Sequence, residues 1–362
     1  MNDILFQPVK LGALELSNAI VMAPMTRDRA GPGDVPTDAM VEYYRQRASA
    51  GLIITEGTQP SPAGKGYWRT PGIWSDDQIA GWRKVSDAVH AEGGKIVMQL
   101  MHCGRVCVTA NKQDASEVIA PSAIACADKV PGPDGVPVAT AMPRALTTDE
   151  VSDVVEEYAQ AARNALEAGM DGVELHCASG YLPNQFLNPN SNQRADKYGG
   201  PVENRIRFPL EILEAMSGAI GSDRVGFRIS PFNPYNDMQD DDPKATFGPL
   251  LQSAAKLDLA YVHLVDIADM LGFVNENYAG TVITNGNLKP DKAAEILSRG
   301  QAQAVSFGRY FISNPDLVER FREEAELARV DREHIYTGES KGYTDYPLRD
   351  AAKDQEYSRS RK

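Results

Sequence analysis

The sequence predicts an α/β protein folded as a closed TIM (β/α)8 barrel, and three observations support this. Short apolar runs alternate with amphipathic helical runs up to about residue 314, as expected for a parallel sheet with crossover helices. Eight such runs occur, and eight strands form a closed barrel more naturally than an open sheet. No Gly-x-Gly-x-x-Gly follows any of them, which disfavours a dinucleotide-binding Rossmann unit.

The predicted strands are short and apolar on both faces, as a parallel strand covered on both sides requires. They are Ala19–Ala23, Gly51–Thr55, Lys95–Leu100, Gly172–Leu175, Val225–Ile229, Tyr261–Val265, Val282–Asn285 and Ala304–Phe307. The clearest helices between them are Asp76–Ala91, Thr148–Ala168, Pro201–Ile220, Phe247–Lys256 and Pro290–Ser298. Thr147 or Thr148 is the expected N-cap of the second helix, because a hydroxyl satisfies a free backbone N–H there.

Three segments extend the barrel. Gly12-Ala13, between Phe6–Leu11 and Leu14–Asn18, predicts an N-terminal β-hairpin that closes the amino-terminal mouth. Residues 108–144 form a long irregular excursion after the third strand, and a loop of this length typically covers a site. Pro315–Ala328 alternates in charge and predicts a surface helix.

Composition and charge limit the class of protein. The chain has 362 residues, a length suited to one barrel, so we expect a single domain over residues 1–362 with a polar, frayed tail from about residue 350. The net charge of −13 disfavours nucleic acid and anionic membrane surfaces as partners. Four cysteines do not suggest a disulfide framework, and neither a signal peptide nor a membrane-spanning run is visible. We expect a cytoplasmic monomer or homo-oligomer.

Polar residues follow the predicted strands at the edge where parallel barrels place their chemistry. His176, Ser179 and Tyr181 come within six positions after the fourth strand, an unusual concentration of proton-bearing groups. Gln99 and Arg228 end the third and fifth strands and could bind the edge of a flat heteroaromatic ring. Arg228 would stabilise an anionic reduced ring. A structural histidine and a salt-bridged arginine are the alternatives.

The ends of the last two strands indicate a phosphate site. Asn285-Gly286-Asn287 and Gly308-Arg309 offer close backbone approach and a guanidinium where barrels commonly bind phosphate. A turn glycine beside a surface arginine is the alternative interpretation.

Together these strand ends resemble the old yellow enzyme family of FMN-dependent ene-reductases, in its Thr-bearing branch. The resemblance extends from about Leu5 to Pro347. The matching phrases are Met22-Ala23-Pro24-Met25-Thr26-Arg27, Thr55-Glu56-Gly57-Thr58, Gly72-Ile73-Trp74, Gln99-Leu100, Gly180-Tyr181-Leu182, Asn184-Gln185-Phe186-Leu187, Ser191-Asn192-Gln193-Arg194, Asp196-Lys197-Tyr198-Gly199-Gly200, Glu203-Asn204-Arg205, Phe307-Gly308-Arg309 and Gly342-Tyr343-Thr344-Asp345-Tyr346-Pro347.

The resemblance implies non-covalent FMN at the carboxyl end of the barrel, reduced by NADH or NADPH. It assigns to the flavin Ala23, Pro24, Met25, Thr26, Gly57, Gln99, His176, Arg228, Asn285, Gly286, Gly308 and Arg309. Hydride would then pass to an electron-poor alkene such as an enone or nitroalkene. Tyr181 would protonate the substrate, and His176 would donate to its activating oxygen.

Two residues depart from the family pattern. Ser179 stands where the family usually has Asn or His, and a serine hydroxyl reaches less far. Met101 stands where the family usually has Trp, which predicts a roomier substrate pocket. Tyr67 and Trp74 are further candidates for the substrate pocket, and Tyr343 and Tyr346 are candidates for ligand contact or for packing.

Two alternatives belong to other classes. The first is a metal-dependent barrel hydrolase that uses His102, His176 and Asp266, although no metal-ligand spacing supports it. The second is a specialised flavoprotein of a biosynthetic or degradative pathway, an isomerase or a nitro or nitrate-ester reductase, with weak activity on simple enones.

Overall fold

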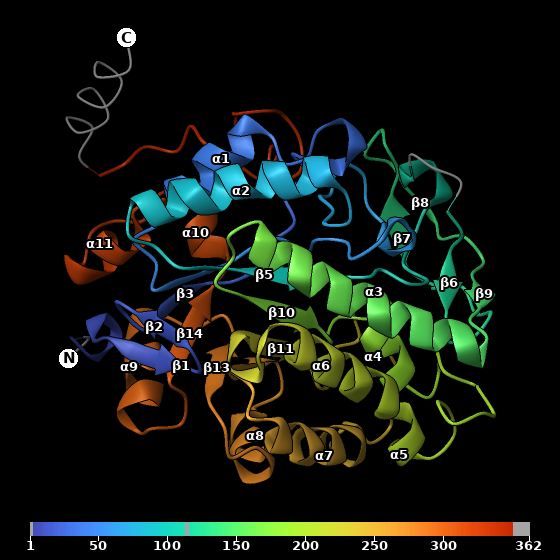
Figure 1. Ribbon diagram of the computed structural model, residues 1–362. Coiled ribbons are helices and arrows are strands. Elements are labelled where there is room, and N and C mark those ends of the chain that lie inside the picture. The colour runs from blue at the N-terminus through green and yellow to red at the C-terminus, as the bar shows by residue number, and fades with distance from the viewer. Residues whose placement is uncertain (1–2, 113–115, 350–362) are drawn as a thin grey trace.

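The computed structural model describes residues 3–112 and 116–349 and contains a closed barrel of eight parallel strands surrounded by helices (Figure 1). Around the barrel the strands follow the order β10-β11-β12-β13-β14-β3-β4-β5. Their bounds are β3 Ile20–Met22, β4 Leu52–Ile54, β5 Ile96–Leu100, β10 Gly172–His176, β11 Val225–Ile229, β12 Tyr261–Val265, β13 Val282–Asn285 and β14 Ala304–Phe307. The prediction of a TIM barrel is confirmed, and the polar tail from about residue 350 lies outside the described residues.

Helices cover the outside of the barrel. They are α1 Asp38–Arg45, α2 Asp76–Ala91, α3 Thr148–Glu167, α4 Leu182–Leu187, α5 Val202–Arg205, α6 Arg207–Ile220, α7 Pro243–Ala254, α8 Leu271–Asn277, α9 Pro290–Ser298, α10 Arg309–Ser313 and α11 Leu317–Arg322. Helix α3 begins as its sequence predicts, because Thr147 accepts a bond from the N–H of Glu150 in a capping box.

Three helix predictions need correction. The predicted helix Pro201–Ile220 is two helices that meet at Ile206. Helix α7 begins at Pro243 rather than Phe247, because Asp242 caps it by accepting from the N–H of Ala245. The last helix, α11, is shorter than the predicted Pro315–Ala328. It lies at the surface but buries an apolar face that includes Leu317 and Phe321.

The N-terminal hairpin closes the amino-terminal end of the barrel as expected. It consists of β1 Val9–Leu11 and β2 Leu14–Leu16, which pair antiparallel. Gly12 at the turn has φ +57, and a Cβ there would lie 2.3 Å from the carbonyl oxygen of Asp223. The N–H of Ala13 donates to the same oxygen at 2.8 Å, two residues before β11 begins.

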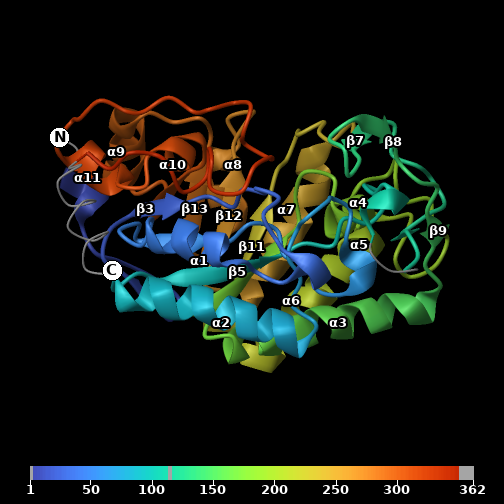
Figure 2. The ribbon, with the colours of Figure 1, turned by 90° about the horizontal axis from the view of Figure 1, so that it is seen from above.

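The excursion after β5 lies at the opposite end of the molecule from this hairpin in both views (Figures 1 and 2). It was expected to be irregular, but its described part forms four short strands, the last of which extends one residue beyond it. They are β6 Ile119–Ala120 paired with β9 Arg144–Ala145, and β7 Lys129–Pro131 paired with β8 Pro137–Ala139. Val108 and Val130 of the excursion pack in one apolar cluster with Met101 and Tyr181, so the excursion covers the carboxyl end of the barrel.

The barrel strands are almost wholly buried, which places the main apolar core in and around the barrel. Among the described residues, no helix is both long and apolar enough to cross a membrane.

Candidate active site

Three side chains converge where β10 ends. The rings of His176 and Tyr181 meet edge to face with centroids 4.6 Å apart and an interplanar angle of 72°. The phenol oxygen of Tyr181 lies 3.1 Å from that of Tyr67, which comes from the loop after β4. The structure therefore brings together three of the residues that the sequence singled out.

A tight turn returns the chain from His176 to Tyr181. Ser179 and Gly180 both adopt left-handed backbone, with φ of +54 and +77. The N–H of Ser179 donates to the hydroxyl of Ser230 at 2.8 Å, and the amide of Asn236 donates to the Ser179 carbonyl at 2.8 Å. A Cβ on Gly180 would lie 2.6 Å from Asn236, so only glycine fits there.

Burial sets the protonation of these groups. It raises the pKa of Tyr181 and of Tyr67 well above the ordinary value, so both phenols keep their protons. Burial, followed by the nearby Arg228 and His263, holds the pKa of His176 well below its usual value. The imidazole is therefore neutral. Its Nδ1 is buried and has no hydrogen-bond partner among the described residues.

Two polar side chains lie deeper, inside the barrel. The amide of Gln99 donates to Glu174 Oε1 at 2.8 Å. Arg228 is only 9% exposed, yet no hydrogen bond or ion pair of its guanidinium is found within residues 3–112 and 116–349. A buried guanidinium without such a partner is costly, which indicates that a ligand supplies the acceptor.

An open cavity of about 1010 Å³ lies beside the ends of β3 and β14. Met25, Gly308 and Arg309 contribute to its wall, together with Tyr336 from the C-terminal segment. Arg309 is exposed, so its guanidinium is accessible to a ligand.

The remaining predicted ligand contacts lie at neighbouring strand ends. Ala23 is buried and donates its N–H to Phe307 O, while Pro24 and Thr26 are half-buried. The amide of Asn285 donates to Ser306 O at 2.9 Å. Gly57 and Gly286 fill places without room for a side chain. A Cβ would lie 2.4 Å from Met101 Sδ at the first and 2.7 Å from Asp266 O at the second.

Some predicted residues lie elsewhere. Trp74 lines a separate cavity of about 300 Å³ with Asp34 and Lys65, so its place in the substrate pocket stays a prediction. Tyr343 stacks on Tyr43 with centroids 4.1 Å apart, and the Tyr346 hydroxyl accepts from the N–H of Asp331. Both are packed within their own chain, which favours the packing interpretation.

The geometry does not support the metal-hydrolase alternative. Within residues 3–112 and 116–349, the one group of three His, Cys, Asp or Glu residues with converging ligand atoms is Asp331, Glu333 and His334. His102, His176 and Asp266 do not form such a group. The described site instead combines neutral proton donors with an unpaired buried arginine.

Comparison with known proteins identifies the family. Residues 4–328 match the model of the NADH:flavin oxidoreductase / NADH oxidase family, an FMN oxidoreductase family. A probable flavin mononucleotide-dependent alkene reductase of Leishmania infantum is 41% identical, and the match covers 96% of this chain and 98% of that protein. The chain belongs to this family.

Solved structures agree with this assignment. Morphinone reductase superposes with a TM-score of 0.91 at 44% identity, with 96% of this chain and 97% of that chain covered. The old yellow enzyme homologue of Zymomonas mobilis gives 0.91 at 40% identity, with 95% and 99% covered. The resemblance to the old yellow enzyme family is therefore confirmed, and the chain is an FMN-dependent oxidoreductase that uses a nicotinamide hydride donor.

The described residues fit an FMN of this family. Among the described residues the guanidinium of Arg228 has no hydrogen bond or ion pair, and the amide of Gln99 has one bond, to Glu174, so the two match a ring edge that carries both acceptors and a donor. The cavity beside Met25, Gly308 and Arg309 is large enough for the phosphate-bearing chain of FMN. The fit rests on polar groups of Arg228 and Gln99 that keep hydrogen-bonding capacity within the described part of the chain.

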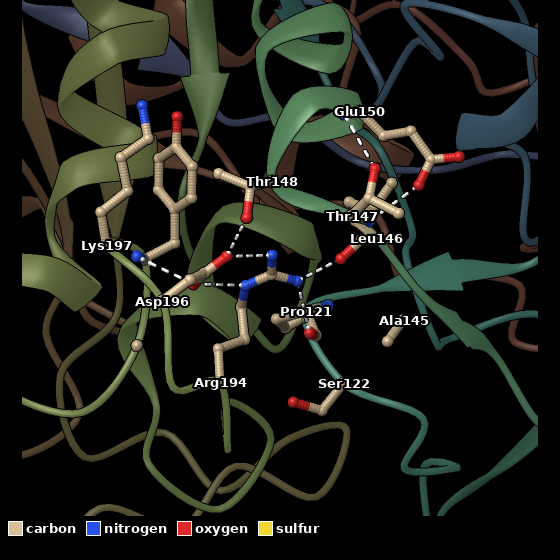
Figure 3. Close-up of polar contacts among 12 residues, drawn as sticks. Pro121, Ser122, Ala145, Leu146, Thr147, Thr148, Glu150, Arg194, Asp196 and Lys197 are labelled. Carbon is tan, nitrogen blue, oxygen red and sulfur yellow. Dashed lines mark hydrogen bonds and ion pairs between the residues drawn. The ribbon is translucent and has the colours of Figure 1, made fainter.

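Part of the family sequence pattern makes contacts that stabilise the fold. Arg194 binds Asp196 through two nitrogens, and it also donates to the carbonyl oxygens of Pro121 and Leu146 (Figure 3). Thr148 donates to the same carboxylate at 2.6 Å. These bonds hold Pro121 and Leu146, on either side of residues 122–145, against the loop after α4, so the phrases that contain Arg194 and Asp196 form a structural clamp.

Sequence reasoning missed some residues. Tyr336 lines the large cavity, although its sequence neighbourhood gives no sign of this beyond an aromatic in a polar loop. Glu174 and His263 were assigned to apolar strands, yet they form a fully buried hydrogen-bonded pair. A charged residue within a wholly buried strand was the signal that could have revealed them.

Proposed function

We propose that this family member is an ene-reductase that saturates the carbon–carbon double bond of electron-poor alkenes such as enones or nitroalkenes. The observation that carries the proposal is the pairing of Tyr181 with His176 at the end of β10. One is a protonated phenol and the other a neutral imidazole whose Nδ1 has no partner among the described residues. The Leishmania relative, named as an alkene reductase, supports the same reaction.

The family resemblance and the positions of these residues at the strand ends support the following roles in binding FMN. Gln99 and Arg228 would hold the pyrimidine edge of the flavin, and Thr26 would contact its O4. Gly286, Gly308 and Arg309, beside Asn285, would hold the phosphate. Ala23, Pro24, Met25 and Gly57 would line the ring with their backbone. The bound cofactor would supply the hydride transfer from the nicotinamide to the alkene.

The chain's own residues supply the proton and stabilise the charge. His176 donates to the activating oxygen of the substrate, which stabilises the negative charge that develops there. Tyr181 gives its phenolic proton to the α-carbon, and Tyr67 orients the phenol through their shared hydrogen bond. Proton transfer of this kind contributes about 10²–10⁴-fold to the rate.

The substrate is a small molecule that lies against Met101, Tyr67 and the catalytic pair. Met101 is buried against Gly57 and leaves less bulk there than a tryptophan would, so we propose that bulky electron-poor substrates are accepted. We propose that NAD(P)H occupies the same place. A solved structure of morphinone reductase in complex with tetrahydroNAD supports a nicotinamide as the hydride donor.

We also propose that residues 1–362 act as one domain in the cytoplasm. All four cysteines are free and buried, as expected in a reducing compartment. The acidic net charge of −13 supports a partner that is neither nucleic acid nor membrane.

A specialised flavoprotein with weak activity on simple enones is the second candidate. Ser179 favours it, because the hydroxyl accepts only a long bond of 3.4 Å from Asn233 and is shorter than the usual amide or imidazole. Loss of an oxyanion donor typically costs about 2.7–4 kcal/mol of transition-state stabilisation.

An anaerobic visible spectrum tests the proposal. We expect the oxidised flavin band to bleach with NADPH or NADH and to recover when cyclohexenone is added. Bleaching without recovery would favour the specialised flavoprotein. A protein without a flavin band after reconstitution with FMN would contradict the cofactor assignment itself.

A further inference from the structure

A chain of buried polar groups crosses the barrel below the predicted flavin site. Glu174, His263 and Ser306 come from β10, β12 and β14, alternate strands of the kind that contribute one interior layer of a barrel. His263 Nδ1 lies 2.9 Å from Glu174 Oε2, and His263 Nε2 lies 2.7 Å from Ser306 Oγ. Glu174 Oε1 accepts from the Gln99 amide at 2.8 Å.

The protonation states of Glu174 and His263 determine which group donates each hydrogen bond in this network. Burial opposes ionisation of Glu174, but His263, Arg228 and Gln99 outweigh it and hold the pKa of its carboxyl below the usual value. Burial lowers the pKa of His263, so its ring is neutral. A carboxylate only accepts, so His263 carries its proton on Nδ1 and accepts the Ser306 hydroxyl at Nε2.

Glu174 therefore has both carboxylate oxygens in use. Oε1 accepts a hydrogen bond from the amide nitrogen of Gln99, and this bond fixes the orientation of the amide group. The amide oxygen and the second N–H of Gln99 then remain for a ligand. The other carboxylate oxygen is held by His263. Within the described part of the chain, Arg228 has no ion-pair contact, so it interacts with this carboxylate only at longer range.

These contacts assign a positioning role that lies outside the catalytic pair. We propose that Glu174 orients Gln99 toward the pyrimidine edge of FMN and offsets the charge of Arg228. In this way it sets how strongly the protein prefers reduced over oxidised FMN. The inference rests on the proposed placement of Gln99 and Arg228 beside the flavin, and it deepens that placement.

The charge balance gives a definite expectation. With Glu174 ionised and His263 neutral, the carboxylate and Arg228 together carry no net charge. In Glu174→Gln the positive charge of Arg228 is no longer offset, so the anionic reduced flavin is favoured. In Glu174→Asp the charge remains, but the shorter side chain no longer reaches Gln99.

The test measures FMN binding and midpoint potential on the full chain, with no turnover involved. For Glu174→Gln we expect the ratio of the dissociation constants, oxidised over reduced, to rise about tenfold, a potential about 30 mV more positive. For Glu174→Asp we expect an unchanged ratio and a several-fold weaker affinity for oxidised FMN. Glu157→Gln, on the outer helix α3, is the matched control and should alter neither quantity.

The outcomes separate the inference from the proposed function. A ratio within twofold of wild type in Glu174→Gln would overturn the inference, whatever happens to the affinity. If that variant does not fold, Glu174→Asp decides. An unchanged affinity for oxidised FMN in Glu174→Asp would overturn the inference, and so would a tenfold change in the ratio of the two dissociation constants. Failure of the wild-type protein to bind FMN would instead contradict the proposed function.

Discussion

The phenol oxygens of Tyr67 and Tyr181 lie 3.1 Å apart, although the two residues come from loops that follow different barrel strands. Burial keeps both phenols protonated, so one donates to the other, and the remaining hydroxyl proton is available to a substrate. This pair therefore presents a single oriented proton beside His176, and the first prediction concerns it.

Removal of the Tyr181 hydroxyl should separate the two half-reactions. In Tyr181→Phe we expect flavin reduction by NADPH to stay within about twofold of wild type, while reoxidation by cyclohexenone slows by about 10²–10⁴-fold, the usual range for a lost proton donor. Stopped-flow spectra measure both steps. Tyr67→Phe is the matched control. We expect it to slow reoxidation less, because it removes only the hydrogen bond that orients the Tyr181 phenol. Equal slowing in the two variants would refute the assignment of Tyr181.

Ser179→Asn should strengthen the site. Ser179 has φ +54, a conformation that Asn adopts more readily than most residues, so the backbone should accept the change without strain. The longer amide should donate to the substrate oxygen and raise the rate of reoxidation by enones about tenfold or more. Ser179→Ala should not raise the rate of reoxidation, because alanine adds no donor. An unchanged rate in Ser179→Asn, with unchanged thermal stability, would show that the substrate oxygen lies elsewhere.

Met101→Trp should narrow the range of substrates. Met101 lies against Gly57 and Tyr181, so a larger ring must extend toward the substrate. We expect bulky enones to lose turnover about tenfold relative to cyclohexenone, as measured by kcat/KM for each. Met101→Leu preserves approximate volume and should change little. An unaltered ratio in Met101→Trp would count against the roomier pocket.

The Arg194 clamp should hold the excursion in place. Arg194→Lys cannot make the planar bonds to Asp196, Pro121 and Leu146, so we expect a lower Tm and faster proteolysis within residues 121–146. Arg144→Lys is the control. Arg144 is exposed and its ion pairs with glutamates are on the surface, so little should change. Equal protease sensitivity in both variants would contradict the clamp.

Stability should fall as pH rises, because of Asp28, a partly buried aspartate whose Oδ1 is buried without a hydrogen-bond partner among the described residues. Burial, followed by the nearby Glu56, raises the pKa of Asp28 to about 8. The folded state therefore holds a proton that the unfolded chain releases near pH 4, and the stabilisation is lost as pH rises through 8. The free energy of unfolding should decrease with pH between these values, by up to about 1.4 kcal/mol per unit for this proton.

Urea unfolding at pH 5.5 and 8.5 measures this dependence. We expect Asp28→Asn to flatten it only in part, because burial also raises the pKa of Glu56, to about 7. Asp87→Asn, at an exposed position of α2, should keep the wild-type slope. An identical slope in Asp28→Asn would show that Asp28 is ionised in the folded protein.

The sequence by itself determined the barrel and the place of its chemistry. Eight buried runs could be located because a parallel strand covered on both faces must be apolar throughout, and polar residues at their ends could then be assigned to one mouth. It also pointed to His176 and Tyr181, because they lie only five positions apart in one short segment after a strand. The turn between them is held in part by bonds with the distant Ser230 and Asn236.

Only the tertiary structure decided which distant groups meet. Tyr67 and Tyr181 are separated by 114 positions, and Glu174 and His263 by 89, so no local pattern could pair them. The start of α7 depends on its Asp242 cap, and the bounds of α11 depend on the burial of its apolar face. The periodicity of the sequence reveals neither. Hydrogen bonds and ion pairs depend on distances of a few ångströms, and those distances are fixed only when the barrel closes.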